Sequence, residues 1–190
     1  KGTKYESLLL SNVDKPIIIK NEKNIFYDEV YHMIADINKY LYKKRITRQH
    51  VLNNLVRHLK NENGLPAICF LFSRKNVEIA ASEINFSLFD EECTTPNTIE
   101  QECHQIIMKK LPNYKEFLIL PEYVKMIDLY KKGIGIHHAG ILPVFREITE
   151  MLFEQKKLKL LFATETLAVG INFSTTSVIY TNITKFDGNN

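Results

Sequence analysis

Five short apolar runs, separated by helical patterns, constrain the fold of this chain more than any other feature of its sequence. Most of them are continuous rather than alternating with polar residues, which is typical of strands buried on both faces of a parallel sheet. Strands that alternate with helices predict an α/β fold, an open parallel sheet with right-handed crossovers. The expected strands are 16–19, 67–72, 134–136, 158–163 and 178–183.

Helix-start signals precede three of the helical patterns. Thr47 is expected to be the N-cap of one helix, and Pro143 to lie in the first turn of another. The sequence at 98–101 fits a capping box that begins with Thr98. The segment 76–132 is long for one crossover, so we expect it to add further helices. The apolar stripes expected to face the core are Val51, Leu52, Leu55, Val56 and Leu59; Ile99, Cys103, Ile106, Ile107 and Leu111; and Val144, Ile148, Met151 and Leu152.

Composition places the chain among ordinary soluble globular proteins. Its 190 residues (22.1 kDa) are 45% hydrophobic and 25% charged, which excludes a disordered, collagen-like or coiled-coil chain. The apolar runs are far shorter than the ~18 residues of a membrane span, and the N-terminus lacks a secretory signal. No linker composition interrupts the chain, so we expect one domain over 1–190, with an entry segment and first helices at 1–63. Lys1 in place of Met indicates a piece of a longer protein.

The charge pattern and the cysteines give weaker signals. The net charge is +3, yet residues 39–60 hold seven Lys and Arg, two His and no acidic residue. Such a run either faces a phosphate backbone or forms a solvated helix face, and we favour the solvated face because it is commoner. Cys69, Cys93 and Cys103 show no CxxC spacing, which predicts a reducing intracellular compartment without a disulfide framework or a zinc site.

Three of the strand ends carry the candidate binding residues. Ligands bind outside the carboxyl ends of the strands in an open parallel sheet. Free backbone N–H groups at strand-to-helix junctions suit phosphate, so three junctions on one rim could hold successive phosphates of a nucleic-acid strand. The alternative is that Ser73 and Thr164 are ordinary N-caps. The junctions are 73–74, 137–140 and 164–166.

Two segments imitate the motifs of a nucleotide hydrolase. Gly135 and Gly140 have the spacing of P-loop glycines, but an Ile-Leu pair stands where Lys and Ser or Thr are required. Residues 25–31 resemble a Walker B strand, but no P-loop precedes them, and we interpret Asp28 as the cap of a helix start. The chain therefore lacks the parts that hydrolyse a nucleotide, and we assign it no catalytic residue.

A metal site and a nucleophilic triad receive little support. His137 and His138 are adjacent, so their side chains are expected to point in different directions, and neither an HExxH motif nor a Cys/Asp cluster accompanies them. We expect a hydrogen-bonded pair instead. Ser73, the histidines and the cysteines form no recognisable triad.

At the same junctions the chain resembles superfamily-two helicases of the DExH type. Residues 66–74 (Pro-Ala-Ile-Cys-Phe-Leu-Phe-Ser-Arg) resemble motif IV. Residues 133–143 (Gly-Ile-Gly-Ile-His-His-Ala-Gly-Ile-Leu-Pro) resemble the segment before motif V in the RNA helicases of the Ski and TRAMP complexes, which feed the exosome. Residues 161–172 (Leu-Phe-Ala-Thr-Glu-Thr-Leu-Ala-Val-Gly-Ile-Asn) are similar to motif V, and 185–188 (Lys-Phe-Asp-Gly) match the segment that follows. The blocks occur in family order and span 64–188.

The resemblance implies the second RecA-like lobe of an ATP-dependent RNA helicase, an open parallel sheet flanked by helices. In such enzymes ATP and Mg²⁺ bind between two lobes, mainly through the first lobe, and the motor moves 3′ to 5′ on single-stranded or partly duplex RNA. The implied partners are the first lobe of the same chain and an exosome-type complex, in the nucleus or cytoplasm. Gly170 and Asn172 fall where the family lines the nucleotide cleft. The implied RNA-binding residues are Ser73, Arg74, His138, Gly140, Thr164, Glu165 and Thr166.

The sequence departs from the family pattern at two places. Residues 173–176 (Phe-Ser-Thr-Thr) replace an apolar residue, a proline, a small residue and a basic residue. The chain also ends at Asn190, before motif VI, whose arginines act on the transferring phosphate. We therefore expect the isolated chain to be inactive as an ATPase.

Three alternatives remain open on the sequence alone. The chain could be a degenerate, non-catalytic helicase lobe that binds RNA or protein as a scaffold, or a lobe of a related helicase that acts on DNA or in splicing. A small-molecule α/β binding domain is a third option, for which no glycine-rich fingerprint is present. The many Lys, Asn and Ile residues point to an AT-rich genome, such as that of a parasite or a large DNA virus.

Overall fold

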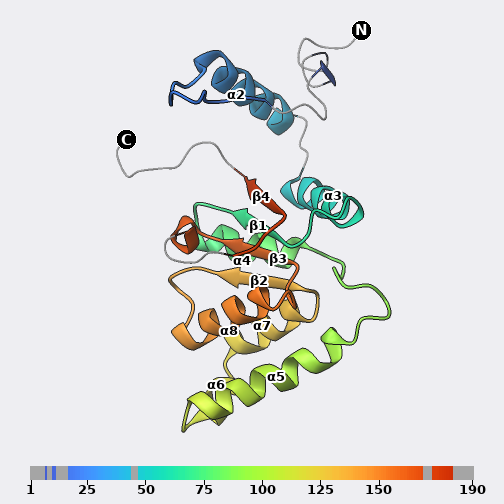
Figure 1. Ribbon diagram of the computed structural model, residues 1–190, viewed down its shortest axis with the longest axis vertical. Coiled ribbons are helices and arrows are strands. Elements are labelled where there is room, and N and C mark those ends of the chain that lie inside the picture. The colour runs from blue at the N-terminus through green and yellow to red at the C-terminus, as the bar shows by residue number, and fades with distance from the viewer. Residues whose placement is uncertain (1–6, 8–9, 12–16, 44–46, 169–172, 182–190) are drawn as a thin grey trace. The chain divides into compact units, whose positions relative to one another are not determined.

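Four parallel strands lie side by side in the order β2-β3-β1-β4 and form the one sheet among the described residues (Figure 1). The structure, a computed structural model, describes residues 7, 10–11, 17–43, 47–168 and 173–181. The strands are β1 (Ala67–Phe70), β2 (Ile134–His137), β3 (Leu160–Ala163) and β4 (Ser177–Tyr180). Each lies within or beside a predicted apolar run, and the predicted parallel α/β fold is confirmed.

The contacts divide the chain into two units, Lys1–Val51 and Leu52–Asn190. The smaller unit contains α2 (Asp28–Lys43), and the larger one holds the sheet and most of α3 (Arg48–Asn61). The domain bounds predicted from the sequence stay a prediction.

The expected strand at 16–19 is wrong for its described residues, 17–19. The chain makes an isolated antiparallel bridge between Lys20 and Phe26 instead. The physical reason is a tight turn: the Asn21 side-chain oxygen accepts the backbone N–H groups of Lys23 and Ile25, and Asn24 has φ of 65°. The segment therefore folds back on itself and does not extend into a sheet.

Helices cover the sheet in layers. The segment 76–132 adds the expected extra helices, since α4 (Arg74–Glu83) is followed by α5 (Thr95–Lys110), α6 (Tyr114–Leu118) and α7 (Pro121–Tyr130) before β2. Helix α4 packs against β2 and β3, whereas α7 and α8 (Pro143–Glu154) pack against β2. Helix α5 contacts α6, α7 and α8 and lies beyond α7 and α8 from the sheet (Figure 1).

The predicted helix starts are partly confirmed. The Thr47 hydroxyl accepts the His50 N–H at 3.2 Å in front of α3, and Pro143 lies in the first turn of α8. A helix also starts at Asp28, although this residue is the first of α2 rather than its cap. The capping box at Thr98 is wrong: α5 begins at Thr95 with a proline in its first turn, and the Thr98 hydroxyl donates to the Thr95 carbonyl. Proline, whose φ suits a first turn, moves the start forward.

The core lies where the apolar runs predict it, with two exceptions, Val51 and β4. Val51 was expected to face the core but is 52% exposed, because Leu52, Asn53 and Val56 form the buried face of α3. Strands β1, β2 and β3 are buried at every position, whereas β4 alternates between half-buried and exposed residues. The expectation of burial on both faces is therefore wrong for β4. Both β2 and β4 are edge strands, but α4, α7 and α8 pack against β2, whereas β1 is the one described element that packs closely against β4.

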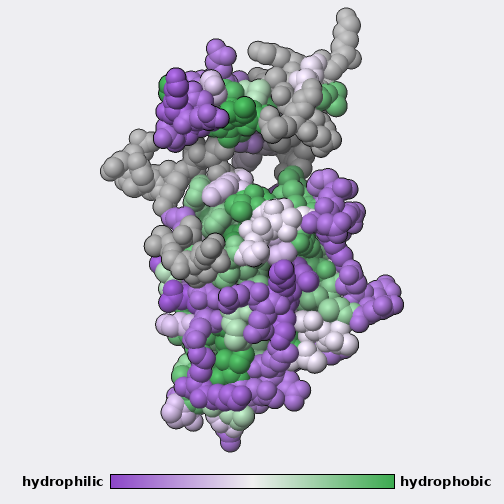
Figure 2. All heavy atoms as spheres, in the orientation of Figure 1, coloured by the Kyte–Doolittle hydropathy of each residue, from purple (hydrophilic) through white to green (hydrophobic). Residues whose placement is uncertain are grey.

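The outer face of the larger unit is mainly hydrophilic, with apolar side chains between the polar ones over α5, α7 and α8 (Figure 2). Three lysine–glutamate ion pairs connect α5 to α8 and to the segments just after α7 and α8. Exposed pairs of this kind contribute little each. The pairs are Lys110–Glu147, Lys131–Glu100 and Lys157–Glu102.

Candidate nucleic-acid interface

The three predicted junctions leave the sheet at the same level, along its carboxyl edge. His137, Ala163 and Phe70 lie in one row of the register across β2, β3 and β1. Backbone bonds extend the pairing into the loops: the Thr164 N–H donates to the His137 carbonyl at 3.1 Å, and the Leu71 N–H donates to the Ala163 carbonyl at 2.9 Å. The structure therefore brings all three loops together at one edge.

The seven predicted RNA-binding residues at this edge differ in exposure. His138 is 3% exposed and Thr164 is 7% exposed, while Ser73 and Glu165 are half-buried. The buried pair has little surface to offer a ligand and can act on one chiefly through its neighbours. The exposed members of the set are Arg74, Gly140 and Thr166.

Ser73 is the N-cap of α4, which was the alternative to a phosphate-binding role in the sequence analysis. Its backbone is extended, and its hydroxyl oxygen accepts the Asn76 N–H at 3.5 Å. A hydroxyl that accepts in this way still has its own hydrogen to donate. The capping role is thus confirmed, and an additional RNA contact stays a prediction.

Thr164 begins a tighter turn than an α-helix. Its carbonyl accepts the Leu167 N–H at 3.1 Å at the start of the 3₁₀-helix η1 (Glu165–Ala168). Its hydroxyl pairs with the Thr166 hydroxyl at 2.9 Å. The buried threonine therefore orients the exposed one.

The backbone donors of the loop after β2 are used within the protein. The Gly140 N–H donates to His138 Nδ1 at 3.1 Å, the Ile141 N–H to the His138 carbonyl at 3.1 Å, and the Leu142 N–H to Glu122 Oε1 at 3.3 Å. The prediction of free N–H groups is wrong for these three residues, because the loop closes on its own histidine and on a glutamate of α7. Because Gly140 has no side chain, a ligand can approach its backbone closely. A Cβ at this position would lie only 3.1 Å from His138 Nδ1.

The two histidines have separate partners, which confirms the expected hydrogen-bonded pair. His137 Nε2 lies 2.6 Å from Glu150 Oε1 on α8. His138 Nε2 faces Glu78 Oε1 on α4 at 3.4 Å. Among the residues that the structure describes, no three His, Cys, Asp or Glu side chains gather in a group that could hold a metal ion.

Burial sets the charge state of this loop. Burial lowers the pKa of His138, with nearby Arg74 acting in the same direction and Glu78 opposing it. The imidazole is therefore neutral at pH 7. The hydrogen bond from Lys125 holds the pKa of Glu78 below its usual range, so this carboxylate is charged.

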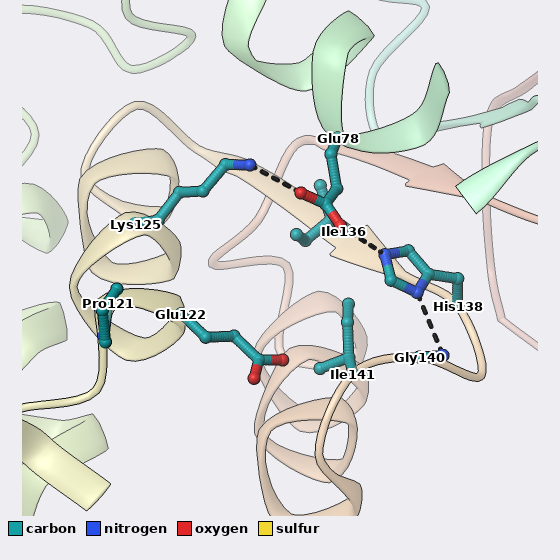
Figure 3. A pocket seen from close by; sticks show the side chains of 8 residues that line it. All are labelled: Glu78, Pro121, Glu122, Lys125, Ile136, His138, Gly140 and Ile141. Atoms are coloured by element: carbon teal, nitrogen blue, oxygen red, sulfur yellow. Dashed lines mark hydrogen bonds and ion pairs between the residues drawn. The ribbon is translucent and has the colours of Figure 1, made fainter. Parts of the chain in front are cut away.

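A cavity of about 360 Å³ opens beside the loop. Lys125 on α7 and His138 approach Glu78 from two sides (Figure 3). Sequence reasoning missed Glu78, Glu122 and Lys125, because they belong to no motif and reach the loop from helices distant in the sequence. The lining residues are Glu78, Pro121, Glu122, Lys125, Ile136, His138, Gly140 and Ile141.

The predicted nucleotide-binding residues, Gly170 and Asn172, lie outside the described residues, as does the block at 185–188. The departure at 173–176 is described, and it contributes to packing. Phe173 meets the Phe153 ring edge-on at 5.1 Å, and the Thr176 N–H donates to the Pro66 carbonyl at 2.8 Å.

Two basic residues of the run at 39–60 serve the fold. The Arg57 guanidinium lies over the Phe86 ring at 4.7 Å, and Lys60 donates to the Phe89 carbonyl at 3.0 Å and pairs with Asp90 at 3.3 Å. These contacts tie α3 to the segment after α4. They favour the interpretation of this part of the run as a helix face over a phosphate contact.

Comparison with known proteins gives relatives of one kind. No protein-family model matches the chain. It is 38% identical to the antiviral helicase SKI2 of Saccharomyces cerevisiae over 136 residues, 71% of this chain and 10% of that protein. It is 37% identical to the human exosome RNA helicase MTR4 over 139 residues, 70% of this chain and 12% of that protein. An uncharacterized helicase of Schizosaccharomyces pombe is 30% identical over 181 residues, 91% of this chain and 17% of that protein.

The parallel sheet flanked by helices, together with these relatives, defines the class as a RecA-like helicase lobe. More narrowly, the chain belongs to the family of DExH-box RNA helicases that includes Ski2 and Mtr4. It spans between 10% and 17% of the length of the relatives named above. Within the described ranges, every helix is too short or too polar to span a bilayer.

Proposed function

We propose that the chain is the second motor lobe of an ATP-dependent RNA helicase that moves 3′ to 5′ and separates duplexes in RNA processing or decay. The observation that carries this proposal is the common level at which the loops after β1, β2 and β3 leave the sheet. The relatives are named as RNA helicases, one of them as an exosome helicase, which favours RNA over a DNA or splicing substrate.

The RNA strand would run along this edge. Arg74 supplies positive charge, Gly140 permits a close approach, and Thr166 supplies a hydroxyl, while Ser73 and Glu165 are half-buried. His138 and Thr164 hold their exposed neighbours in place. Contacts of these kinds go to phosphate and sugar, so binding is tolerant of sequence, as a translocating motor requires.

ATP would bind between this lobe and a first RecA-like lobe. Gly170 and Asn172 would line the cleft near the ribose, while most ligands of ATP and Mg²⁺ would come from the first lobe. The 190 residues contain no P-loop lysine, so we expect the chain alone not to hydrolyse ATP. The wider partner would be an exosome-type complex in the nucleus or cytoplasm.

The test is Thr164→Ala in the complete helicase. Loss of the hydroxyl frees Thr166, so RNA-stimulated ATP turnover should fall while the affinity for ATP stays nearly unchanged. Thr98→Ala is the matched control, because that hydroxyl bonds only within α5, to the Thr95 carbonyl. Equal loss of turnover and ATP binding in Thr164→Ala would count against a place on the RNA track.

A second candidate function is a non-catalytic scaffold, favoured by the turn at 173–176. That turn lacks the proline and the basic residue of the family pattern, and Phe173 and Thr176 serve the packing of the lobe. The same assay separates the candidates. A scaffold would bind RNA with no RNA-stimulated turnover in the unmodified protein.

A further inference from the structure

Glu78 joins three elements around the loop after β2. Its Oε2 accepts a hydrogen bond from Lys125 Nζ of α7 at 2.8 Å (Figure 3). Its Oε1 lies 3.4 Å from His138 Nε2, an electrostatic contact that does not meet hydrogen-bond geometry. Both Glu78 and Lys125 are close to half exposed, and an exposed ion pair alone contributes little. What distinguishes this pair is its third member, an imidazole that is 3% exposed.

The hydrogen bonds define the tautomer of that imidazole. His138 Nδ1 accepts the Gly140 N–H at 3.1 Å, so it carries no hydrogen. In a neutral ring the hydrogen then lies on Nε2, the nitrogen that faces the Glu78 carboxylate. The carboxylate thereby favours the one tautomer that can hold the Gly140 backbone.

Residues of α4 and α7 also hold the two ends of this loop. Arg74 lies four residues before Glu78, on the same face of α4, and its Cδ lies 3.4 Å from the position of a Cβ on Gly140. On the other side, Glu122 of α7 accepts the Leu142 N–H at 3.3 Å. Helix α4 therefore fixes the start of the loop and α7 fixes its end.

We propose that Glu78, held by Lys125, is a positioning residue that keeps His138 as the Nε2–H tautomer and thereby fixes the backbone of Gly140 at the RNA-facing edge. The expected effect on RNA binding rests on the proposed function. A loop that is already held in one conformation can contact RNA without first being ordered. The geometry of the loop itself does not depend on that function.

The experiment uses the 190-residue chain and its Glu78→Ala variant. Long-range ¹H–¹⁵N correlation spectra report the tautomer of His138, and amide hydrogen exchange reports the bond from Gly140. The unmodified chain should show the Nε2–H form. Glu78→Ala should show a mixture of both tautomers, with exchange at Gly140 accelerated about fivefold, the effect expected when one ordinary hydrogen bond is lost. Affinity for a single-stranded oligouridylate, measured by fluorescence anisotropy, should fall by up to about the same factor.

Two further variants separate positioning from a general loss of stability. Glu78→Gln keeps an oxygen whose partial negative charge can face Nε2–H, so it should retain the tautomer although the full charge is gone. Glu100→Gln removes a comparable ion pair, with Lys131 just beyond α7, and should leave His138 and Gly140 unchanged. Loss of the tautomer in both glutamine variants would overturn the proposal, since it would point to a general loosening of the lobe.

The outcomes for Glu78→Ala distinguish this inference from the function it rests on. An unchanged tautomer and unchanged exchange at Gly140 would overturn the positioning role. A changed tautomer with unchanged affinity for RNA would support positioning and contradict the RNA role of the loop. If Glu78→Ala does not fold, Lys125→Met tests the other half of the proposal, because it releases the carboxylate without removing it. A mixture of tautomers would support positioning by the held carboxylate, and an unchanged tautomer would overturn the part assigned to Lys125.

Discussion

Gly135 provides the sharpest test of the packing that supports the interface. It lies within β2, next to the edge loop, and a Cβ on it would approach three side chains: Leu158 Cδ1 at 2.9 Å, Leu161 Cδ1 at 3.0 Å and Thr149 Cγ2 at 3.0 Å. All three residues are fully buried, so none can move away into solvent. Overpacking a core costs ~1–3 kcal/mol, and three simultaneous close contacts place Gly135→Ala in the upper part of that range, about 2–3 kcal/mol.

For a chain of this size, each kcal/mol lowers the Tm by ~2–4 °C, so Gly135→Ala should melt about 4–12 °C below the parent. The assay is thermal and urea unfolding followed by circular dichroism. The control is the double variant with Thr149→Ser, which removes Cγ2 but keeps the hydroxyl that bonds to Tyr130 and to the Phe145 carbonyl. Its destabilisation should be smaller than the sum of the single effects by at least ~0.5 kcal/mol. A Tm within about 2 °C of the parent, or strict additivity, would refute the reasoning.

Three other outcomes follow from buried polar groups. Burial lowers the pKa of His138 from its ordinary value of 6.5, so the unfolded state takes up the proton first as the pH drops. The free energy of unfolding should therefore fall as the pH drops through that value, and it should fall less in His138→Gln. Equal slopes of this free energy against pH in the two proteins, between about pH 7.5 and about pH 5.5, would contradict the prediction. Thr149→Val leaves the buried Tyr130 hydroxyl without an acceptor and should cost ~1–3 kcal/mol in urea unfolding, whereas Tyr130→Phe should cost about 1 kcal/mol; the reverse order would show that the pair does not act as described. The hydrogen bond with the Thr95 hydroxyl lowers the pKa of the Cys93 thiol, whereas burial raises the pKa of the other two thiols to about 12. A thiol reagent should therefore label one cysteine quickly in the folded chain and none in Cys93→Ser.

The sheet could be predicted because its strands are continuous apolar runs, a pattern that parallel strands require. The prediction of a strand at 17–19 failed for a local reason that was present in the sequence. Asn21 and Asn24 form a turn that begins two residues after three isoleucines, and the prediction gave the apolar run more weight than the turn residues. The start of α5 was misplaced for a similar reason, since Thr98 fits a capping box, but the proline two residues earlier decides the start. The exposure of β4 could not be predicted, because it depends on which edge strand the helices cover in space, and they cover β2.

The candidate interface was predictable in position but not in its internal bonding. Strand ends and family-like motifs identified the loops, whereas the partners of His138 come from α4 and α7, on which no motif falls. Glu78 lies sixty residues before His138, and only folding brings the two together. Gly135 is a case in which a motif-like residue has a structural role. It has the spacing of a P-loop glycine, but close packing against buried neighbours, rather than a phosphate, accounts for a glycine at this position.

The way in which the edge is held determines how RNA binding should respond to mutation. The row of His137, Ala163 and Phe70 sets the level of the three loops, and the bonds from Thr164 and Leu71 continue that row past the strands. Each loop then closes on a side chain of its own, by the cap at the start of α4, by the imidazole after β2 and by the hydroxyl pair after β3. Because these bonds form within the protein, RNA would meet residues 73–74, 138–142 and 164–166 already fixed, so binding would cost little conformational entropy there. Substitution of an exposed residue should therefore change affinity through its own contact alone, whereas substitution of a buried one should change several contacts together.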